Sequence, residues 1–203
     1  MDENWRFIDC HWGARHVDKS RVTTTTITTT QKQNDGTGSG GGNGGVFCYS
    51  LDEFFFLTDP EDLIYMHYPD DPKWQLLEKP IDMDRFSSMP VVKSTFFHYK
   101  LKFMRDCKST LQTENGLVDV LIRKYGHLDL VFNTRLEAGG ERFMGHCIYQ
   151  NADAGVVFHV NLPYAGEYIF TVFACERGTS DVFSNVCSFK VKHIIRKQPL
   201  LFY

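Results

Sequence analysis

The stretch WRFIDCHWGARH, which runs from Trp5 to His16, is rich in residue types that could do chemistry. Asp9 stands there among aromatic residues, where a carboxylate is costly unless a donor group binds it. One such donor is the ring N–H of a histidine, which an aspartate orients in a Cys-His-Asp arrangement. Another is a set of backbone N–H groups at the end of the element. The pattern leaves both interpretations open.

Cys10 and His11 are adjacent, as if they were a nucleophile and its base. However, the alternation of residues 4–12 predicts a strand that ends at Gly13. Neighbouring side chains of a strand point to opposite faces, so these two could not act on each other. Cys10 is then interpreted as a small buried hydrophobic residue.

No metal or cofactor site is predicted. Cys10 and Cys48 with His11 and His16 lack the spacing of zinc ligands. The glycine-rich stretch GTGSGGGNGG lacks the Lys-Ser/Thr of a phosphate-binding loop and does not join a strand to a helix. The remaining histidines have no Cys or Asp partner at a recognisable spacing, and we interpret them as surface or satisfied side chains: His67, His98, His127, His146, His159 and His193.

Charge and hydropathy exclude several classes of function. The 22 Lys and Arg against 25 Asp and Glu give a net charge of -3, which argues against a nucleic-acid or anionic membrane surface. No apolar run approaches the roughly 20 residues that span a bilayer, and MDENWRF lacks the basic start of a signal peptide. The six cysteines form no CxxC pair. We therefore expect a cytoplasmic protein with reduced thiols.

The composition changes abruptly along the chain. Residues 20–45 are mainly Thr, Gln, Asn, Gly and Ser, which predicts a disordered insertion. Ordered structure is expected to resume at Val46, with proline residues ending short elements. The expected elements are a strand-like run over residues 46–57, a helix over Pro60–His67 capped by Thr58, a helical turn over Met83–Ser88 and a long strand over Val91–Phe103.

From about residue 106 the sequence shows six or seven short strands. They recur at the roughly 8 to 12 residue spacing typical of a β-sandwich. Tyr168 follows the turn of LPYAGE, where its hydroxyl could bind the preceding corner as in immunoglobulin-type sandwiches, or could remain an ordinary core tyrosine. Phe170 stands where such domains carry a disulfide cysteine, so we expect a sandwich without that bond.

Several stretches resemble the kyphoscoliosis peptidase and hillarin group of animal cytoskeleton-associated proteins. WRFIDCHWGARHV is similar to the strand W-x-x-x-D-x-x-W-G that carries the triad aspartate of a transglutaminase-like core. EFFFLTDPEDLIYMHYPDDPKWQLL, MPVV and LPYAGEYIFTVFA also resemble this group. Its members have a papain-like core, with Cys, His and Asp in that order, before an immunoglobulin-like sandwich. The resemblance implies that Asp9 is the triad aspartate and that Trp12 lies in the active-site wall. It places the Cys and His upstream of Trp5.

The predicted fold class is mainly β, with the end of a papain/transglutaminase-like α+β core followed by an immunoglobulin-like β-sandwich. We expect a terminal core strand over residues 1–19, the insertion over 20–45, the rest of the core with a connecting segment over 46–105, and the sandwich over 106–203.

Two functions follow from this organisation. Without its Cys and His the chain should not catalyse acyl transfer, and we expect an interaction module for cytoskeletal or scaffolding proteins. The alternative function is that the chain forms part of an active cysteine protease or transamidase, whose Cys and His lie upstream of Met1. A third possibility stays open, in which the whole protein is a non-catalytic scaffold and Asp9 serves only its folding.

Overall fold

The computed structural model describes residues 5–13, 16–18, 46–48, 51–104, 107–153, 155–179 and 182–195. The chain divides into a smaller unit over residues 7–57 and a larger unit that holds residues 1–6 and 58–203. The insertion predicted over residues 20–45 lies outside the described residues.

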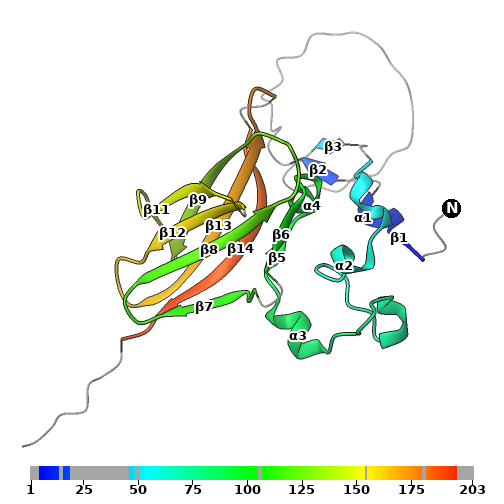
Figure 1. Ribbon diagram of the computed structural model, residues 1–203, viewed down its shortest axis with the longest axis horizontal. Helices are drawn as coiled ribbons and strands as arrows, with labels where there is room; N and C mark the ends of the chain where they lie inside the picture. The colour runs from blue at the N-terminus through cyan, green and yellow to red at the C-terminus, as the bar shows by residue number, and fades with distance from the viewer. Residues whose placement is uncertain are drawn as a thin grey trace, which may run out of the picture. The chain divides into compact units, whose positions relative to one another are not determined.

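Most of the larger unit is a β-sandwich of two sheets (Figure 1). Sheet I has the strand order β10-β9-β13-β14-β5, with β7 parallel to β14, and sheet II has the order β11-β12-β8-β6. In sheet I the strands are β10 (Glu141–Phe143), β9 (Leu130–Ala138), β13 (Gly166–Glu176), β14 (Ser184–His193), β5 (Val91–Val92) and β7 (Thr110–Thr113). In sheet II they are β11 (Cys147–Ala152), β12 (Gly155–Asn161), β8 (Leu117–Lys124) and β6 (Leu101–Phe103).

These sheets confirm the prediction of a mainly β chain with an immunoglobulin-like sandwich. The six or seven short strands predicted after residue 106 are present as β7 to β14, and the strand predicted over residues 142–150 is divided into two, β10 and β11. Between these two strands Gly145 adopts a φ of 76°, a left-handed conformation that suits glycine in a tight turn.

The interior of the sandwich is aromatic. Phe158 on β12, Phe170 on β13 and Phe189 on β14 are each at most 1% exposed. The ring centroids of Phe158 and Phe170 lie 6.2 Å apart, and those of Phe170 and Phe189 lie 6.4 Å apart. Burying each such ring contributes roughly 2 to 3 kcal/mol. Phe170 therefore joins the two sheets by packing, at the position where immunoglobulin-type domains carry a disulfide cysteine.

The strand predicted over Val91–Phe103 is wrong, because α4 (Ser94–His98) interrupts it. β5 pairs with β14 in sheet I, whereas β6 pairs with β8 in sheet II, so the chain must cross between the layers here. The helix and the left-handed Lys100, with a φ of 53°, make that crossing. Both strands precede residue 106, so the sandwich takes in residues that were assigned to the connecting segment.

Two helices of the larger unit begin at aspartate caps, whereas α4 begins after Lys93 without a side-chain cap. α3 (Met83–Ser88) has the predicted bounds, and Asp82 Oδ1 accepts from the Arg85 N–H at 2.7 Å. α2 (Pro60–Leu63) is shorter than predicted and is capped by Asp59, whose Oδ1 accepts from the Glu61 N–H at 3.0 Å. The prediction of Thr58 as the cap is wrong. A 3₁₀ turn, η2 (Pro72–Gln75), lies between them.

The smaller unit contains short elements rather than the strand predicted over residues 4–12. Among the described residues 5–12, the strand is limited to β1 (Phe7–Ile8), which pairs with β4 (Phe56–Thr58) before α1 (Cys10–Gly13) begins. β2 (His16–Asp18) pairs with β3 (Val46–Cys48). The run predicted as extended over residues 46–57 is divided by the 3₁₀ helix η1 (Glu53–Phe55).

Tyr168 forms a tyrosine corner. Its side chain is 3% exposed, and its hydroxyl donates to the carbonyl oxygen of Tyr164 at 2.9 Å. The same hydroxyl oxygen accepts from the Tyr164 N–H at 3.2 Å. The interpretation of Tyr168 with a bond to the preceding corner is therefore confirmed, and the bond ties the start of β13 to the turn before it.

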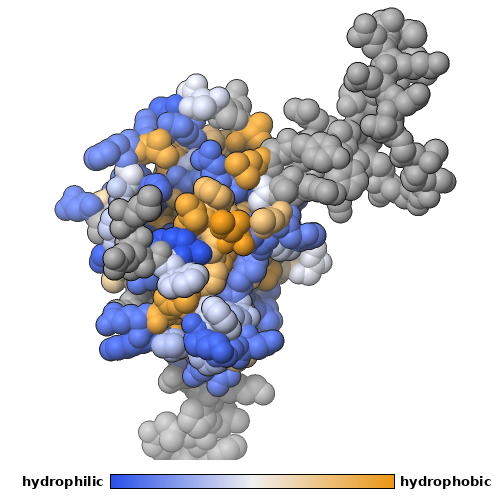
Figure 2. Space-filling model, turned by 90° about the vertical axis from the view of Figure 1, so that its right-hand side faces the viewer, coloured by the Kyte–Doolittle hydropathy of each residue, from blue (hydrophilic) through white to orange (hydrophobic). Residues whose placement is uncertain are grey.

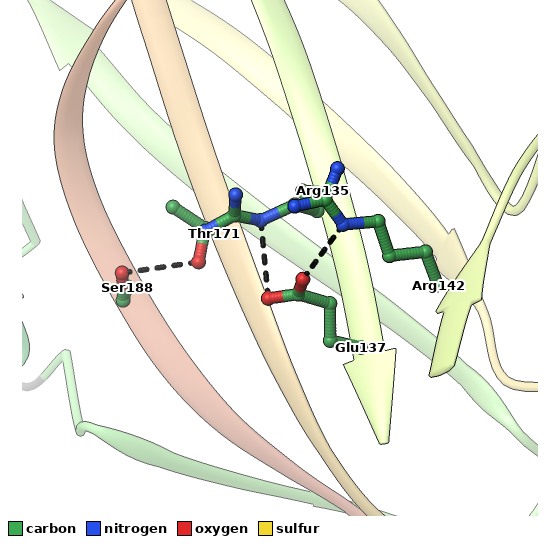
Figure 3. Close-up of polar contacts among 5 residues, drawn as sticks. All are labelled: Arg135, Glu137, Arg142, Thr171 and Ser188. Carbon is green, nitrogen blue, oxygen red and sulfur yellow. Dashed lines mark hydrogen bonds and ion pairs between the residues drawn. The ribbon is translucent and has the colours of Figure 1, made fainter. Parts of the chain in front are cut away.

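The outer face of sheet I carries ordered polar contacts (Figure 3). Glu137 on β9 accepts from Arg142 at 3.0 Å and lies 3.1 Å from Nε of Arg135, while the hydroxyls of Ser188 and Thr171 lie 3.2 Å apart. On the same sheet Glu167 lies 2.8 Å from Lys190 Nζ and 2.7 Å from Lys192 Nζ. Hydrogen bonds from these two lysines lower the pKa of Glu167 to about 2.

Replacing Tyr168 with Phe removes the corner bond and leaves the Tyr164 N–H and carbonyl without that partner. We expect Tyr168→Phe to lower the free energy of unfolding by about 1 kcal/mol. Urea denaturation monitored by fluorescence measures the change. Tyr164→Phe is the control, because the Tyr164 ring is exposed. An equal loss in both variants would show that the corner bond is not responsible.

The Glu167 contacts predict a pH dependence of stability. The pKa of Glu167 in the folded chain lies below its ordinary 4.5, so the stabilisation is present above that pH and is lost as the pH falls toward 2. The difference in urea midpoint between the native chain and Glu167→Gln should therefore shrink from about pH 5 to about pH 2. Because the contacts are exposed, added salt should also reduce this difference in urea midpoint. A difference that is constant with pH would contradict the assignment.

Candidate functional site

Asp9, the predicted triad aspartate, is half-buried at the start of α1. Its Oδ1 accepts hydrogen bonds from the backbone N–H groups of His11 and Trp12, both at 2.9 Å. The backbone N–H of Asp9 donates to the carbonyl oxygen of Phe55 at 2.9 Å. The carboxylate therefore acts as a helix cap, which was the second of the two interpretations. The role of Asp9 in a catalytic triad stays a prediction.

The residues around Asp9 are held by a close backbone packing. Gly13, which is buried, donates its N–H to the Asp9 carbonyl at 3.0 Å and accepts from the Asp52 N–H at 2.9 Å. A Cβ on Gly13 would lie 3.3 Å from the Cβ of Phe55, so a larger residue would have to displace its neighbour. The short strand and the helical turn are thus fixed against η1.

Trp12, predicted in an active-site wall, lies on α1 and is 60% exposed. The His11 ring meets it edge-on, with centroids 5.9 Å apart. Because α1 is helical, the argument that Cys10 and His11 point to opposite faces of a strand is wrong. Cys10 is also exposed, so its interpretation as a buried hydrophobic residue is wrong.

Three thiols of the larger unit are in environments that disfavour the thiolate. Burial raises the pKa of Cys107 to about 11 and raises the pKa of Cys187 well above its ordinary value. Burial also raises the pKa of Cys147, although a hydrogen bond with Thr134 opposes this. A nucleophilic cysteine needs a lowered pKa. These three residues are therefore poor nucleophiles.

A shallow groove of about 660 Å³ lies on sheet II. His159 on β12 and Asp119 on β8 are paired across the strands, and their Nδ1 and Oδ1 atoms are 2.7 Å apart. Leu117 and Ile148 line the same groove and are 59% and 70% exposed. The pairing of His159 with Asp119 could not be predicted from their spacing, because only the strand register brings together residues so far apart in the chain.

Cys147 also lines this groove, which places a cysteine close to a histidine and an aspartate. However, Cys147 is opposite the buried Val160, whereas its neighbour Ile148 is opposite His159. The Cys147 side chain therefore lies on the same face of sheet II as Val160, the face that packs against sheet I. The thiol and the imidazole therefore belong to opposite faces of sheet II, and the three residues do not form a triad.

A second hollow of about 530 Å³ lies among α2, α3, α4 and β6. Its apolar lining includes Phe96 and Phe103, whose rings stack with centroids 4.5 Å apart. Its charged lining has both signs, from Asp62, Arg85 and Lys102. Burial raises the pKa of Asp62, and Lys102 opposes this. Such mixed charge does not select an anionic or a cationic ligand.

The described residues contain no group of three His, Cys, Asp or Glu side chains that could hold a metal ion. Within the same ranges every helix falls short of the length and hydropathy needed to cross a bilayer. Large apolar residues are nevertheless exposed in both units, and Figure 2 shows hydrophobic residues reaching the surface on one face. Exposed apolar side chains are therefore available for contacts in each of the two units.

The cap assignment for Asp9 predicts different effects from two substitutions. Asp9→Ala removes the acceptor for two backbone N–H groups and should destabilise α1 by about 1 kcal/mol, whereas Asp9→Asn keeps a capping oxygen and should cost only a few tenths. Amide hydrogen exchange at His11 and Trp12 measures the effect. Equal exchange in the two variants would contradict the cap.

Comparison with known proteins places the larger unit in a family. The model of the KY-like, immunoglobulin-like domain matches residues 83–202. The Lim and transglutaminase domain protein ltd-1 of Caenorhabditis elegans is 30% identical over 94% of this chain and 27% of its own length. Hillarin of Drosophila melanogaster is 28% identical over 92% of the chain and 24% of its own length.

The human kyphoscoliosis peptidase is 27% identical over 95% of the chain and 24% of its own length. The chain thus spans about a quarter of the length of these relatives. The family match begins before β5 and includes both strands that precede residue 106. This match, together with the sandwich and its tyrosine corner, shows that the chain belongs to the family of the KY-like, immunoglobulin-like domain.

Proposed function

We propose that this chain is a non-catalytic, protein-interaction part of a transglutaminase-like, cytoskeleton-associated protein. The observation that carries this proposal is the groove on sheet II, where Leu117 and Ile148 are exposed beside the Asp119–His159 pair. An apolar contact area with a polar rim is the usual composition of a protein interface. The groove is built on paired strands, so its side chains are held in place before a partner binds.

The contacts of Asp9 support the non-catalytic part of the proposal. One oxygen of its carboxylate accepts hydrogen bonds from the backbone N–H groups of His11 and Trp12, which gives Asp9 a role in the fold as a helix cap. The raised pKa values of Cys107, Cys147 and Cys187 likewise argue against a nucleophilic role for these three cysteines of the larger unit. Asp9 can therefore serve the fold of its own unit whether or not a nucleophile is present elsewhere.

A cytoskeletal or scaffolding protein is the proposed partner of the groove. Covering an exposed apolar side chain contributes about 25 cal/mol for each Å² removed from water. The exposed carboxylate of Asp119 and the ring of His159 add polar groups that can set the orientation of a partner. The resemblance to the kyphoscoliosis peptidase and hillarin group supplies the cytoskeletal setting, in which the chain would act in the cytoplasm.

A second candidate is that the chain belongs to an active cysteine protease or transamidase. Two relatives favour it by name, one as a peptidase and one as a transglutaminase domain protein, and each is about four times as long as the matched region. In this case Asp9 would orient a histidine supplied by the preceding sequence. An in-frame Cys and His upstream of Met1 would support the enzyme.

The groove can be tested by affinity capture from a cytoskeletal extract with the 203-residue chain as bait. We expect cytoskeletal proteins to be enriched, and Ile148→Glu to reduce that enrichment by about tenfold or more, because it buries a charge at the contact. The matched control is Ile169→Glu, which adds the same charge at an exposed position on sheet I. Equal capture by both variants, or no cytoskeletal protein captured by the native chain, would contradict the proposal.

A further inference from the structure

β11 is the free edge of sheet II. It pairs with β12 from Cys147 to Ala152 without a register shift, and β12 is its single neighbour in the described sheet. Every residue from Ile148 to Ala152 is exposed. The backbone N–H and C=O groups that point away from β12 therefore face solvent, as a template for a further strand.

This edge lacks the usual protection against pairing. Charged residues, proline and bulges block most exposed edges in natural sheets, yet CIYQNA contains no charge and no proline. The other described edge strands are shorter, and two of them are charged: β10 with Glu141 and Arg142, and β6 with Lys102. β11 is therefore the longest of the strands that end a sheet of the described sandwich, and it carries neither a charge nor a proline.

We propose that β11 pairs in antiparallel fashion with β11 of a second copy of this chain, about a two-fold axis at Gln150. Such an axis is perpendicular to the sheet, so it pairs residues of the same face. Ile148 is opposite Ala152, Tyr149 is opposite Asn151, and Gln150 is opposite itself. Sheets II of the two copies then form one continuous eight-stranded sheet, made from four strands of each copy.

The side chains favour this register over one centred on Tyr149. The register at Gln150 covers the apolar Ile148 with Ala152, whereas an axis at Tyr149 would place Ile148 against the polar Gln150. A glutamine amide both donates and accepts, so two copies of Gln150 can bind each other across the axis. The Tyr149 ring is already packed against Phe132 and Phe158, with centroids 5.7 and 5.8 Å away.

Charge also favours a second copy. A two-fold axis brings like residues together, and a charged side chain near the axis would repel its own copy. The first charged residue after β11 is Asp153, three positions from the axis. Its two copies would be about 20 Å apart at a strand rise of roughly 3.4 Å per residue, beyond the Debye length in physiological salt.

A disulfide trap tests the register. Residues opposite each other in an antiparallel pair have Cα atoms about 4.5 to 5.5 Å apart, within the range of a disulfide bond. Under mild oxidation Gln150→Cys should form a covalent dimer. Asn151→Cys should not exceed the background, because its partner is Tyr149. Both changes are made in Cys10→Ser, which removes an exposed thiol.

Sedimentation of the purified chain tests the pairing without any modification. We expect the mean mass to rise from 23.4 kDa toward twice that value with concentration. Gln150→Lys should abolish the rise, because the axis sets two charges against each other. Gln112→Lys makes the same change at an exposed position on β7 and should dimerise like the native chain.

Three results would overturn the proposal. These are no covalent dimer from Gln150→Cys, equal dimer from the cysteines at positions 150 and 151, or a concentration-dependent mass that Gln150→Lys leaves unchanged. A thermal melt of each variant shows whether it is folded, and Gln150 and Asn151 are both exposed, so neither change disturbs the core. The tests use no other protein, so they do not depend on the partner proposed for the groove.

Discussion

The packing of Phe158, Phe170 and Phe189 is the interaction on which the larger unit depends. These rings lie between the two sheets, and each is almost completely removed from water. Cys175 and Cys187 are buried in the same unit as free thiols, so the layers are joined by apolar contacts rather than by a covalent bond there. Removing any of these rings would open a cavity that a close-packed interior cannot refill.

This interior also decides what reaches the surface. When Val118, Val120 and Ile122 turn inward on β8, the residues between them must turn outward. Asp119 thereby meets His159, and the outer face of sheet II acquires its groove. The same alternation sends Cys147 inward, which separates it from His159. Packing of the core thus places the Asp119–His159 pair on the outer face of sheet II and the Cys147 side chain on its inner face.

In the smaller unit a single side chain, that of Asp9, holds the backbone at the start of α1. Asp9 satisfies two N–H groups that the first turn of α1 leaves unpaired. Its neighbours that carry chemical groups, Cys10 and Trp12, are left exposed around that cap. A carboxylate chosen from the sequence as a catalytic candidate therefore has a local structural role that a short helix requires, and the two roles are compatible in a longer protein.

The sequence by itself determined the β-sandwich and the helix α3, because each depends on local alternation or on the turns and prolines that end an element. It left two interpretations of Tyr168 open, and the structure decided between them through the bond to Tyr164. The sequence could not determine the break of residues 91–103 into β5, α4 and β6, since that break serves a crossing between layers. Nor could it show that Asp119 and His159 meet, or that β11 is an open edge. Those features depend on strand register and sheet order, which only the packing of distant segments decides.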